Sequence, residues 1–590
     1  MAETFAQSRW ALKALLPAHT GPQLTDYLSQ LEETMGDLES TRSQLTPELP
    51  APEFVSILKR YETVSELAHR LGGYAFLWFT EDTQNQDALN FKGRIDQVLA
   101  QASNRMLFFS LWFKSLDDAQ ADRLVAASGD ARYYLESLRR FKPYTLSEAE
   151  EQIITLKDVN GIDALVTVYD MITNKFEFTL EVDGEVKKLT RDALAAYARH
   201  PSPEVRAAAY RELYRVFGEH STLLAQIYNF RVRDWHAEAI QVRHYREPIS
   251  VRNLGNDIPD SVTDTLLSVS RKNNHLFQRY FGLKAKWMGV PKLRRYDIYA
   301  PLLESEKEYG YNESVQLVLD SFRDFSPVLS DQARRVFVDG HIDAEVRPGK
   351  RGGAFCAGIL PGVSPWVLVN FAGRARDVAT LAHELGHAIH ALMAADHSVL
   401  TFHSSLPLAE TASTFAEMLL TDRLLKAEKD VAVRRDLLAG KIDDAYATVQ
   451  RQAYFTLFER EAHGLVNAGH SVDEITVRYQ ANLAEQFGDA VDVAEEFKWE
   501  WISIPHIYHS PFYTYAYSFG QLLVLALYQM YRKEGEAFKP KYLKILSYGG
   551  SESPAKILTE AGIDMASAEF WQGGFDVIKG WIDEAESLTV

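Results

Sequence analysis

The feature that most constrains this chain is the pattern H-E-L-G-H at residues 383–387. If this stretch is helical, residues four apart lie one turn apart on the same face. The imidazoles of His383 and His387 can then bind one metal ion. Glu384 lies next to them and can reach a water molecule held there. Two histidines and a glutamate at this spacing are typical of a catalytic zinc site.

The residues around the pattern predict the helix that it needs. Asp377 is a suitable N-cap, and no proline interrupts the next twenty residues. Apolar residues recur at steps of three and four and form one stripe: Val378, Leu381, Leu385, Ile389 and Leu392. The two histidines fall on roughly the opposite face together with His390, which we interpret as a supporting or core residue.

Composition limits the classes of protein to consider. The chain has 590 residues, 46% hydrophobic and 24% charged, and is long enough to bury a large core. Its net charge of −18 argues against a nucleic-acid partner and fits a monomer or a weak homo-oligomer. The single cysteine, Cys356, suits a reducing compartment and is interpreted as a packing residue. With no secretory signal and no membrane-spanning run, we expect a cytoplasmic protein without a membrane partner.

Most of the chain reads as amphipathic helices, so we expect a mainly α fold. Residues 175–189 differ, because apolar and polar residues alternate there around Asp183-Gly184, which predicts a β-hairpin. We place a domain boundary just after this hairpin. The expected domains are an N-terminal helical domain at 1–195 and a catalytic domain at 196–590, whose first helix starts at Pro203 after a Ser202 cap.

A second β region is predicted directly before the metal-site helix. Four segments have strand character: Arg335–Val338, His341–Val346, Ala354–Ala357 and Trp366–Asn370. Between them, the glycine-rich stretch 348–353 reads as a mobile loop. A small sheet leading into this helix is a suitable place for an extended peptide to add as a strand, although a purely supporting sheet is equally consistent with the residues.

A catalytic zinc site needs a third protein ligand. A third histidine six residues after the second is excluded, because that position is Met393. The remaining candidates are Glu410 and Glu417, seven residues apart and thus two turns apart on one helix face. Spacing barely separates them. The small residues around Glu410 favour it, and the other glutamate can accept a hydrogen bond from a ligand imidazole.

These motifs resemble a known family. The H-E-L-G-H pattern followed by Ala-Glu410-Thr-Ala-Ser resembles the thimet-oligopeptidase (M3) metallopeptidases. The stretches Gly352–Cys356 and Ile504–Tyr517 resemble its oligoendopeptidase F branch, and the resemblance is strongest from about 350 to 520. It implies one Zn²⁺ per chain with Glu410 as the third ligand. It also implies a two-lobed helical shell around a deep substrate channel.

The resemblance gives a role to the aromatic stretch His506–Tyr517, where phenols and imidazoles can hydrogen-bond the oxyanion formed during peptide hydrolysis. We assign this role to His506, Tyr508 and Tyr515. Tyr513 and His509 remain possible substitutes, and Tyr513 is also a candidate substrate contact. Further candidates for contact with the peptide backbone lie in the loop and strand before the metal helix: Gly352, Gly353, Ala354 and Phe355.

Together, these features predict a zinc-dependent endopeptidase that hydrolyses short unstructured peptides by a zinc-activated water, with Glu384 as general base. One alternative is a dipeptidyl carboxypeptidase of the same fold. A second is a non-catalytic peptide-binding protein, which the intact Glu384 disfavours because zinc binding does not require that residue.

Overall fold

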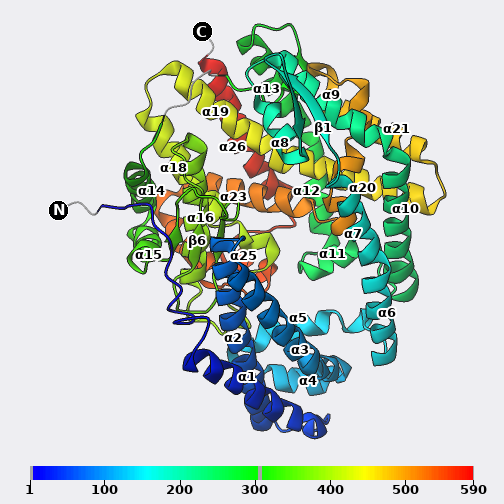
Figure 1. Cartoon of the computed structure of the whole chain (residues 1–590), viewed down its shortest axis with the longest axis vertical. Coiled ribbons are helices and arrows are strands. Elements are labelled where there is room, and N and C mark those ends of the chain that lie inside the picture. Colours follow the sequence, from blue (N-terminus) through cyan, green and yellow to red (C-terminus); the bar gives the residue numbers. More distant parts are fainter. Residues whose placement is uncertain (1–3, 303–307, 589–590) are drawn as a thin grey trace. The chain divides into compact units, whose positions relative to one another are not determined.

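The computed structural model of the chain describes residues 4–302 and 308–588 and is mainly α (Figure 1). It divides into two compact units of three chain segments each. Unit 1 comprises Met1–Pro143, Glu306–Lys426 and Met530–Asp564, and unit 2 comprises Tyr144–Ser305, Ala427–Gln529 and Met565–Val590. Among the described residues, none of the helices has both the length and the apolar character that crossing a bilayer requires.

Unit 1 contains one three-stranded sheet and a set of helices among the described residues. The strands are β4 (Ile342–Asp343), β5 (Phe355–Ala357) and β6 (Trp366–Leu368). The helices are α1 (Pro22–Ser40), α2 (Ala51–Glu81), α3 (Gln86–Ser115), α4 (Asp118–Val125), α5 (Arg132–Arg140), α14 (Tyr311–Phe325), α15 (Pro327–Val338), α16 (Ala375–Met393), α17 (Leu406–Ala409), α18 (Ser413–Ala427), α24 (Lys539–Ser547) and α25 (Pro554–Glu560).

Unit 2 has two two-stranded sheets among the described residues, β1 (Phe178–Val182) with β2 (Glu185–Leu189), and β3 (Leu293–Arg294) with β7 (Val491–Asp492). Its helices are α6 (Glu148–Asn160), α7 (Ile162–Thr173), α8 (Arg191–Ala196), α9 (Pro203–Glu219), α10 (Ser221–His236), α11 (Ser250–Gly255), α12 (Asp260–Lys272), α13 (Asn274–Trp287), α19 (Val431–Ala445), α20 (Arg451–Asn467), α21 (Val472–Phe487), α22 (His506–His509), α26 (Ala568–Ser587) and most of α23 (Tyr515–Glu534).

The division at residue 195 expected from the sequence is not the division that the packing makes. The N-terminal helices of unit 1 share one apolar core with the sheet, in which Trp10 and Leu71 pack in the same cluster as Trp366. The indole N–H of Trp366 also donates to the carbonyl of Ala11, 2.9 Å away. Residues 1–143 therefore do not form a domain separate from the metal-site helix, and the hairpin lies inside unit 2.

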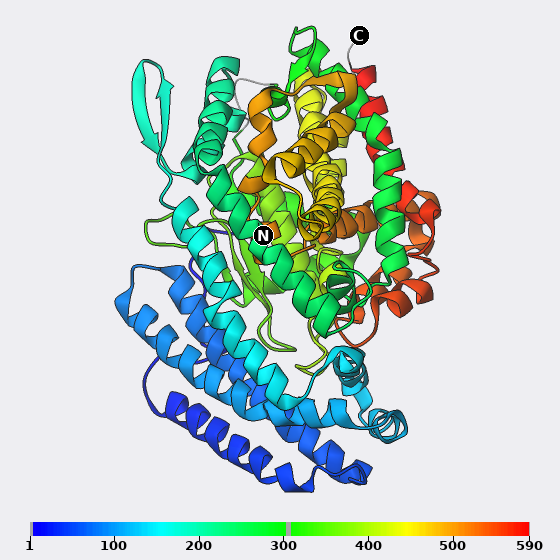
Figure 2. The same cartoon turned by 90° about the vertical axis from the view of Figure 1, so that its right-hand side faces the viewer.

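The predicted hairpin is confirmed. Strands β1 and β2 pair antiparallel around Asp183 and Gly184, whose φ angles are +56° and +79°. Two positive φ values at the turn match the twist of a tight hairpin, and aspartate-glycine adopts them readily. The alternate residues of β1 are buried and pack on α9, and the teal arrows in Figure 2 show the hairpin side-on.

The second β region is partly confirmed. Strands β5 and β6 lie where 354–357 and 366–370 predict them, and in the order β4-β6-β5 no other described strand pairs with the outer edge of β5. The predicted strand Arg335–Val338 is wrong, because it is the last turn of α15. That helix starts with Pro327 at its first position and buries Leu329, Ala333 and Val336 at helical spacing.

Helix α16 forms as predicted, with Val378, Leu381 and Leu385 buried along one stripe. Its first residue is Ala375, so Asp377 is not the N-cap. The Asp377 carboxylate lies in the first turn and accepts the backbone N–H groups of Ala372 and Arg374, at 2.8 and 3.1 Å. A carboxylate at this place accepts hydrogen bonds from N–H groups that lack a partner within the helix. Its negative charge also interacts favourably with the positive end of the helix dipole.

Candidate metal centre and active site

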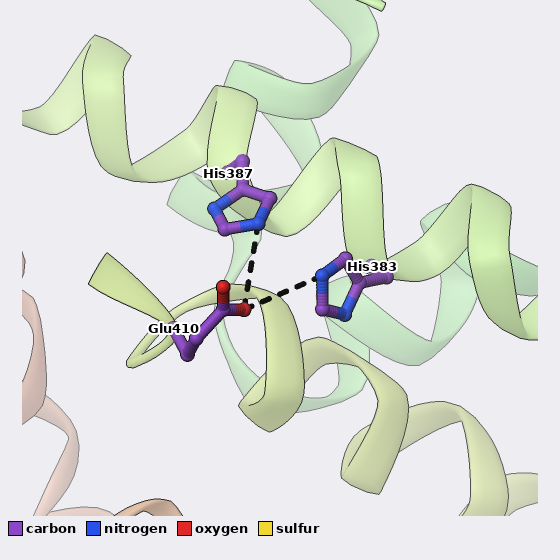
Figure 3. Close-up of side chains that lie close together, drawn as sticks. All are labelled: His383, His387 and Glu410. Atoms are coloured by element: carbon purple, nitrogen blue, oxygen red, sulfur yellow. Dashed lines mark ion pairs between the residues drawn. The ribbon is translucent and has the colours of Figure 1, made fainter. Parts of the chain in front are cut away.

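Three side chains of unit 1 point toward one another at the middle of α16. Glu410 Oε2 lies 3.4 Å from His383 Nε2 and 3.5 Å from His387 Nε2 (Figure 3). One donor atom from each side chain lies within 4.8 Å of the others, so the three can face a single ion. The histidines come from successive turns of α16, as their spacing predicts.

The spacing between Glu410 and Glu417 suggests that both lie on one helix. In the structure, Glu410 lies outside any regular helix. It follows α17 and precedes α18, in a short turn whose backbone lies directly on α16. Gly386 allows this approach, since a Cβ atom there would lie 2.5 Å from Ser413 Cα and 2.7 Å from the Ala412 carbonyl oxygen. Close packing therefore requires glycine at the second variable position of the H-E-x-x-H pattern. The spacing of the motif alone does not indicate this requirement.

Glu417 contacts the other nitrogen of His383. Its Oε1 lies 2.7 Å from His383 Nδ1, which leaves Nε2 to face Glu410. Burial lowers the pKa of His383, but the Glu417 hydrogen bond and its charge outweigh burial and raise the pKa to about 9. A carboxylate that holds the outer nitrogen of an imidazole orients the ring and selects its tautomer.

Glu384 lies beside these groups and is only 6% exposed. Burial, assisted by the charges of Glu410 and Glu417, raises its pKa to about 7. Burial also lowers the pKa of His387, and lowers that of the neighbouring His390 to about 4. His390 is buried, consistent with the supporting role expected for it.

A cavity of about 540 Å³ opens onto the metal-site residues. One wall is the segment 354–358, which includes β5, and another is α16 with His383, Glu384 and His387. Residues 402–404 form a further side. Cys356 lines this cavity, and burial raises the pKa of its thiol well above the ordinary value, which disfavours the nucleophilic thiolate.

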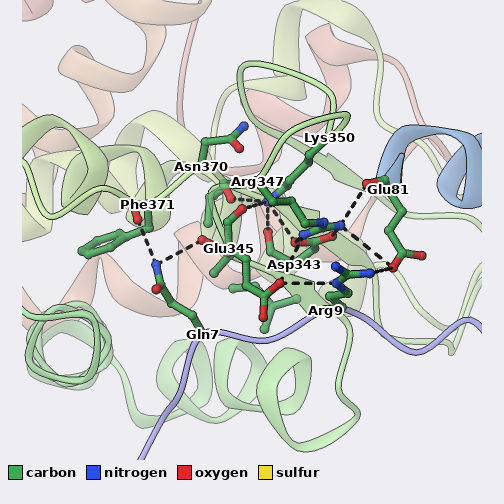
Figure 4. A network of polar contacts seen from close by, with 12 residues as sticks. Gln7, Arg9, Glu81, Asp343, Glu345, Arg347, Lys350, Asn370 and Phe371 are labelled. Carbon is green, nitrogen blue, oxygen red and sulfur yellow. Dashed lines mark hydrogen bonds and ion pairs between the residues drawn. The ribbon is translucent and has the colours of Figure 1, made fainter. Parts of the chain in front are cut away.

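The glycine-rich stretch 348–353 is a loop, as its composition predicts, and side-chain contacts anchor it at several points. The buried Lys350 ammonium lies 2.9 Å from Asp343 Oδ1 and donates to the carbonyls of Glu345 and Val369, at 2.8 and 2.7 Å (Figure 4). The Asn370 amide donates to the Gly353 carbonyl at 2.8 Å. The composition of the stretch does not show that Lys350 and Asn370 anchor this loop by an ion pair and hydrogen bonds.

The packing of Tyr508 and Tyr515 in unit 2 does not fit the roles predicted for them. Tyr508 is fully buried, its ring stacks 3.9 Å from that of Tyr169, and its hydroxyl donates to the Ile502 carbonyl at 3.3 Å. Tyr515 is also fully buried, and its hydroxyl accepts the amide N–H of Asn256 at 2.8 Å. Both phenols are thus occupied inside the unit.

The accessible imidazoles and phenols of the aromatic stretch are His506, His509, Tyr513 and Tyr517. The rings of His506 and Tyr513 are nearly parallel with centroids 6.0 Å apart, and His506 Nε2 lies 3.3 Å from the Tyr517 hydroxyl. Burial lowers the pKa of His506, which favours the neutral imidazole. The exposed His509 pairs with Asp170 at 2.8 Å. Tyr517 was not selected from the sequence, although its spacing of two from Tyr515 places it on a different side of α23.

Comparison with known proteins identifies the family to which the chain belongs. The family model "Peptidase family M3" matches residues 196–577, and the model "Oligopeptidase F" matches residues 112–178. The chain is 25% identical to oligopeptidase PepF of Bacillus subtilis, over 100% of this chain and 88% of that protein. It is 27% identical to the group B oligopeptidase PepB of Streptococcus agalactiae, over 90% of each.

Solved structures share the fold. A Chlamydophila abortus protein solved as a candidate peptidase aligns with a TM-score of 0.89 at 24% identity, covering 98% of each chain. Oligoendopeptidase F of Enterococcus faecium aligns with a TM-score of 0.71 at 24% identity, covering 96% of this chain and 98% of that one. With its family model matched over more than half of its length, the chain belongs to peptidase family M3, in the oligopeptidase F branch, and is a peptide hydrolase.

Proposed function

We propose that this chain is a zinc-dependent endopeptidase that hydrolyses short, unstructured peptides. The observation that supports this most is the convergence of His383, His387 and Glu410, with the buried Glu384 beside the two histidines on the wall of one cavity. Two imidazole nitrogens and one carboxylate oxygen are the donor set of a catalytic zinc site that keeps a position open. The Glu417 hydrogen bond to His383 supplies the supporting contact that such a ligand usually has.

Zinc bound by these three residues supplies Lewis acidity, which polarises a peptide carbonyl and makes water easier to deprotonate. Glu384 accepts a proton from the attacking water and delivers it to the leaving amine. Its burial raises its pKa to about 7, which makes the carboxylate a stronger base than an exposed glutamate.

We assign substrate binding to the outer edge of β5. An extended peptide that pairs with this edge has its backbone fixed beside α16, with its side chains pointing alternately to either side. Ala354 and Phe355 would supply main-chain contacts, and Gly352 and Gly353 the turn before them. Because Lys350 anchors this loop before substrate binds, we expect only a small entropic cost for ordering the loop on binding.

We assign oxyanion stabilisation to His506 together with Tyr513 and Tyr517. These groups are accessible and can donate hydrogen bonds to a developing negative charge. The burial of Tyr508 and Tyr515 is the reason for preferring the other two phenols. A cytoplasmic setting is proposed on the single cysteine alone.

The proposal is tested by digesting one unstructured peptide with free ends and with both ends blocked. We expect internal cleavage of both forms, loss of activity with a chelator, and recovery with added zinc. Release of dipeptides from the free form alone would indicate the carboxypeptidase alternative. Saturable binding without cleavage would indicate a peptide-binding protein. Equal kcat/KM for the peptide alone and within a long unfolded chain would contradict the restriction to short peptides.

A further inference from the structure

The aromatic stretch contains a backbone conformation that its sequence disfavours. Phe512 has a φ of +58°, in the left-handed region that bulky residues avoid. It follows Pro511 and directly precedes Tyr513. A residue of this kind persists in such a conformation only where its surroundings hold it, and such sites cluster where function requires a fixed geometry.

One buried side chain holds the backbone at this position through a hydrogen bond. The N–H of Phe512 donates to Oε1 of Glu459 at 2.9 Å. Glu459 lies in the middle of α20 and is 0% exposed. Its second oxygen, Oε2, has no hydrogen-bond partner within the part of the chain that the structure describes. Burying a carboxyl group with one oxygen unsatisfied costs stability, so packing alone does not account for it.

His463, one helical turn after Glu459, contacts both Glu459 and Phe512. It is 1% exposed, and neither ring nitrogen has a hydrogen-bond partner among the described residues. Its Nε2 lies 3.8 Å from Glu459 Oε1, and its ring centroid lies 4.6 Å from that of Phe512. The backbone of Phe512 therefore meets Glu459 while its side chain packs on His463.

The flanks of the turn are held as well. The Arg252 guanidinium donates to the Pro511 carbonyl at 3.3 Å. On the other side, the hydroxyls of Thr456 and Thr514 lie 2.8 Å apart. These contacts act on residues with ordinary backbone geometry, whereas the Glu459 contact acts on the residue whose φ sets the direction of the chain.

We propose that Glu459 is a positioning residue, which holds the left-handed turn at Phe512 and thereby aligns Tyr513 and Tyr517 with His506. The turn lies between His506 and the two tyrosines in the chain, so its geometry sets their relation. This inference rests on the proposed function, in which these three groups act on the substrate. Glu459 is fully buried in α20 and meets the turn at the N–H of Phe512, so we assign it no direct part in the reaction.

The test uses full-length, zinc-loaded enzyme. Glu459→Leu removes the acceptor at similar volume and is expected to lower kcat by about tenfold to a hundredfold with little change in KM, because small misplacements of acting groups have effects of this size. Glu459→Gln keeps an acceptor oxygen and should stay within a factor of about three. The matched control is Glu461→Gln, at an exposed position of the same helix, which should leave kcat within a factor of about two.

A rescue separates positioning from general destabilisation. Glycine adopts a φ of +58° without steric cost, so Phe512→Gly combined with Glu459→Leu should recover most of the lost kcat. A purely structural role predicts that the double variant is worse than either single one. Should Glu459→Leu fail to fold, Glu459→Asp withdraws the carboxylate by one methylene, and its kcat should fall with the same rescue by Phe512→Gly.

Unchanged kcat in a folded Glu459→Leu or Glu459→Asp variant would overturn the inference, as would the absence of rescue. His506→Ala distinguishes this from failure of the proposed function. If His506→Ala loses activity while the Glu459 variants do not, only the positioning role is wrong. If His506→Ala keeps full activity, the oxyanion role assigned to His506 is wrong and the positioning inference fails with it, whereas the zinc-peptidase proposal, which rests on the three converging donors, is unaffected.

Discussion

The metal helix of unit 1 and the aromatic stretch of unit 2 contrast in how their side chains are placed. In α16, a regular helix turns a spacing of four into two imidazoles on one face, and the structure brings them together. In 504–517, a one-turn helix and a left-handed residue break any periodicity. Which phenols are buried there is decided by distant residues such as Tyr169 and Asn256. Regular structure converts spacing into geometry, and irregular structure does not.

The largest effect that we expect concerns Glu384 on the regular side of this comparison. Glu384→Gln should lower kcat by about a hundredfold to ten-thousandfold, since the amide cannot accept a proton from water. Zinc content should stay at one per chain, because Glu384 is not among the three converging donors. Steady-state kinetics with metal analysis checks both. A variant with full zinc and more than about a tenth of the original kcat would remove Glu384 as the base.

The next prediction concerns the glycine that lets Glu410 approach. Gly386→Ala places a Cβ 2.5 Å from Ser413 Cα, so the turn that carries Glu410 must shift. We expect zinc affinity to fall by about ten- to a hundredfold, measured by competition with a chelator.

The matched control is Gly464→Ala, in helix α20. A Cβ there would meet no atom within 4 Å among the described residues, so this change should be neutral or stabilising. Equal zinc affinity in the Gly386 and Gly464 variants would show that the close packing at Gly386 does not set the position of Glu410.

The smallest effects separate the four tyrosines of the irregular stretch. Tyr513→Phe and Tyr517→Phe should each lower kcat by about tenfold or more, because each removes a donor from the oxyanion. Tyr508→Phe and Tyr515→Phe remove hydroxyls buried in the unit and should lower the free energy of unfolding by about 1 kcal/mol with little change in kcat. The reverse pattern of kcat losses would restore the assignment made from the sequence.

The sequence was most informative where periodicity or turn chemistry dominates. The metal helix, the Asp183-Gly184 hairpin and strands β5 and β6 all appear where predicted. The prediction of a strand at Arg335–Val338 was wrong. These four residues continue the helical pattern that starts at Pro327, which is not visible when they are considered alone.

What the sequence could not give depends on contacts between residues far apart in the chain. The division into units follows from the N-terminal helices sharing a core with Trp366. The anchoring of 348–353 follows from Lys350 donating hydrogen bonds to the carbonyls of Glu345 and Val369. The role of Gly386 becomes visible only once the turn before α18 is seen lying on it. The two-lobed channel implied by the family resemblance stays a prediction.

The central claim is that His383, His387 and Glu410 hold the zinc while Glu417 orients His383. The most direct measurement is the zinc content and affinity of purified Glu410→Ala and Glu417→Ala. We predict that Glu410→Ala loses its zinc, and that Glu417→Ala still binds one zinc per chain with about 10- to 100-fold weaker affinity. A Glu417→Ala enzyme without zinc beside a fully loaded Glu410→Ala enzyme would contradict the account.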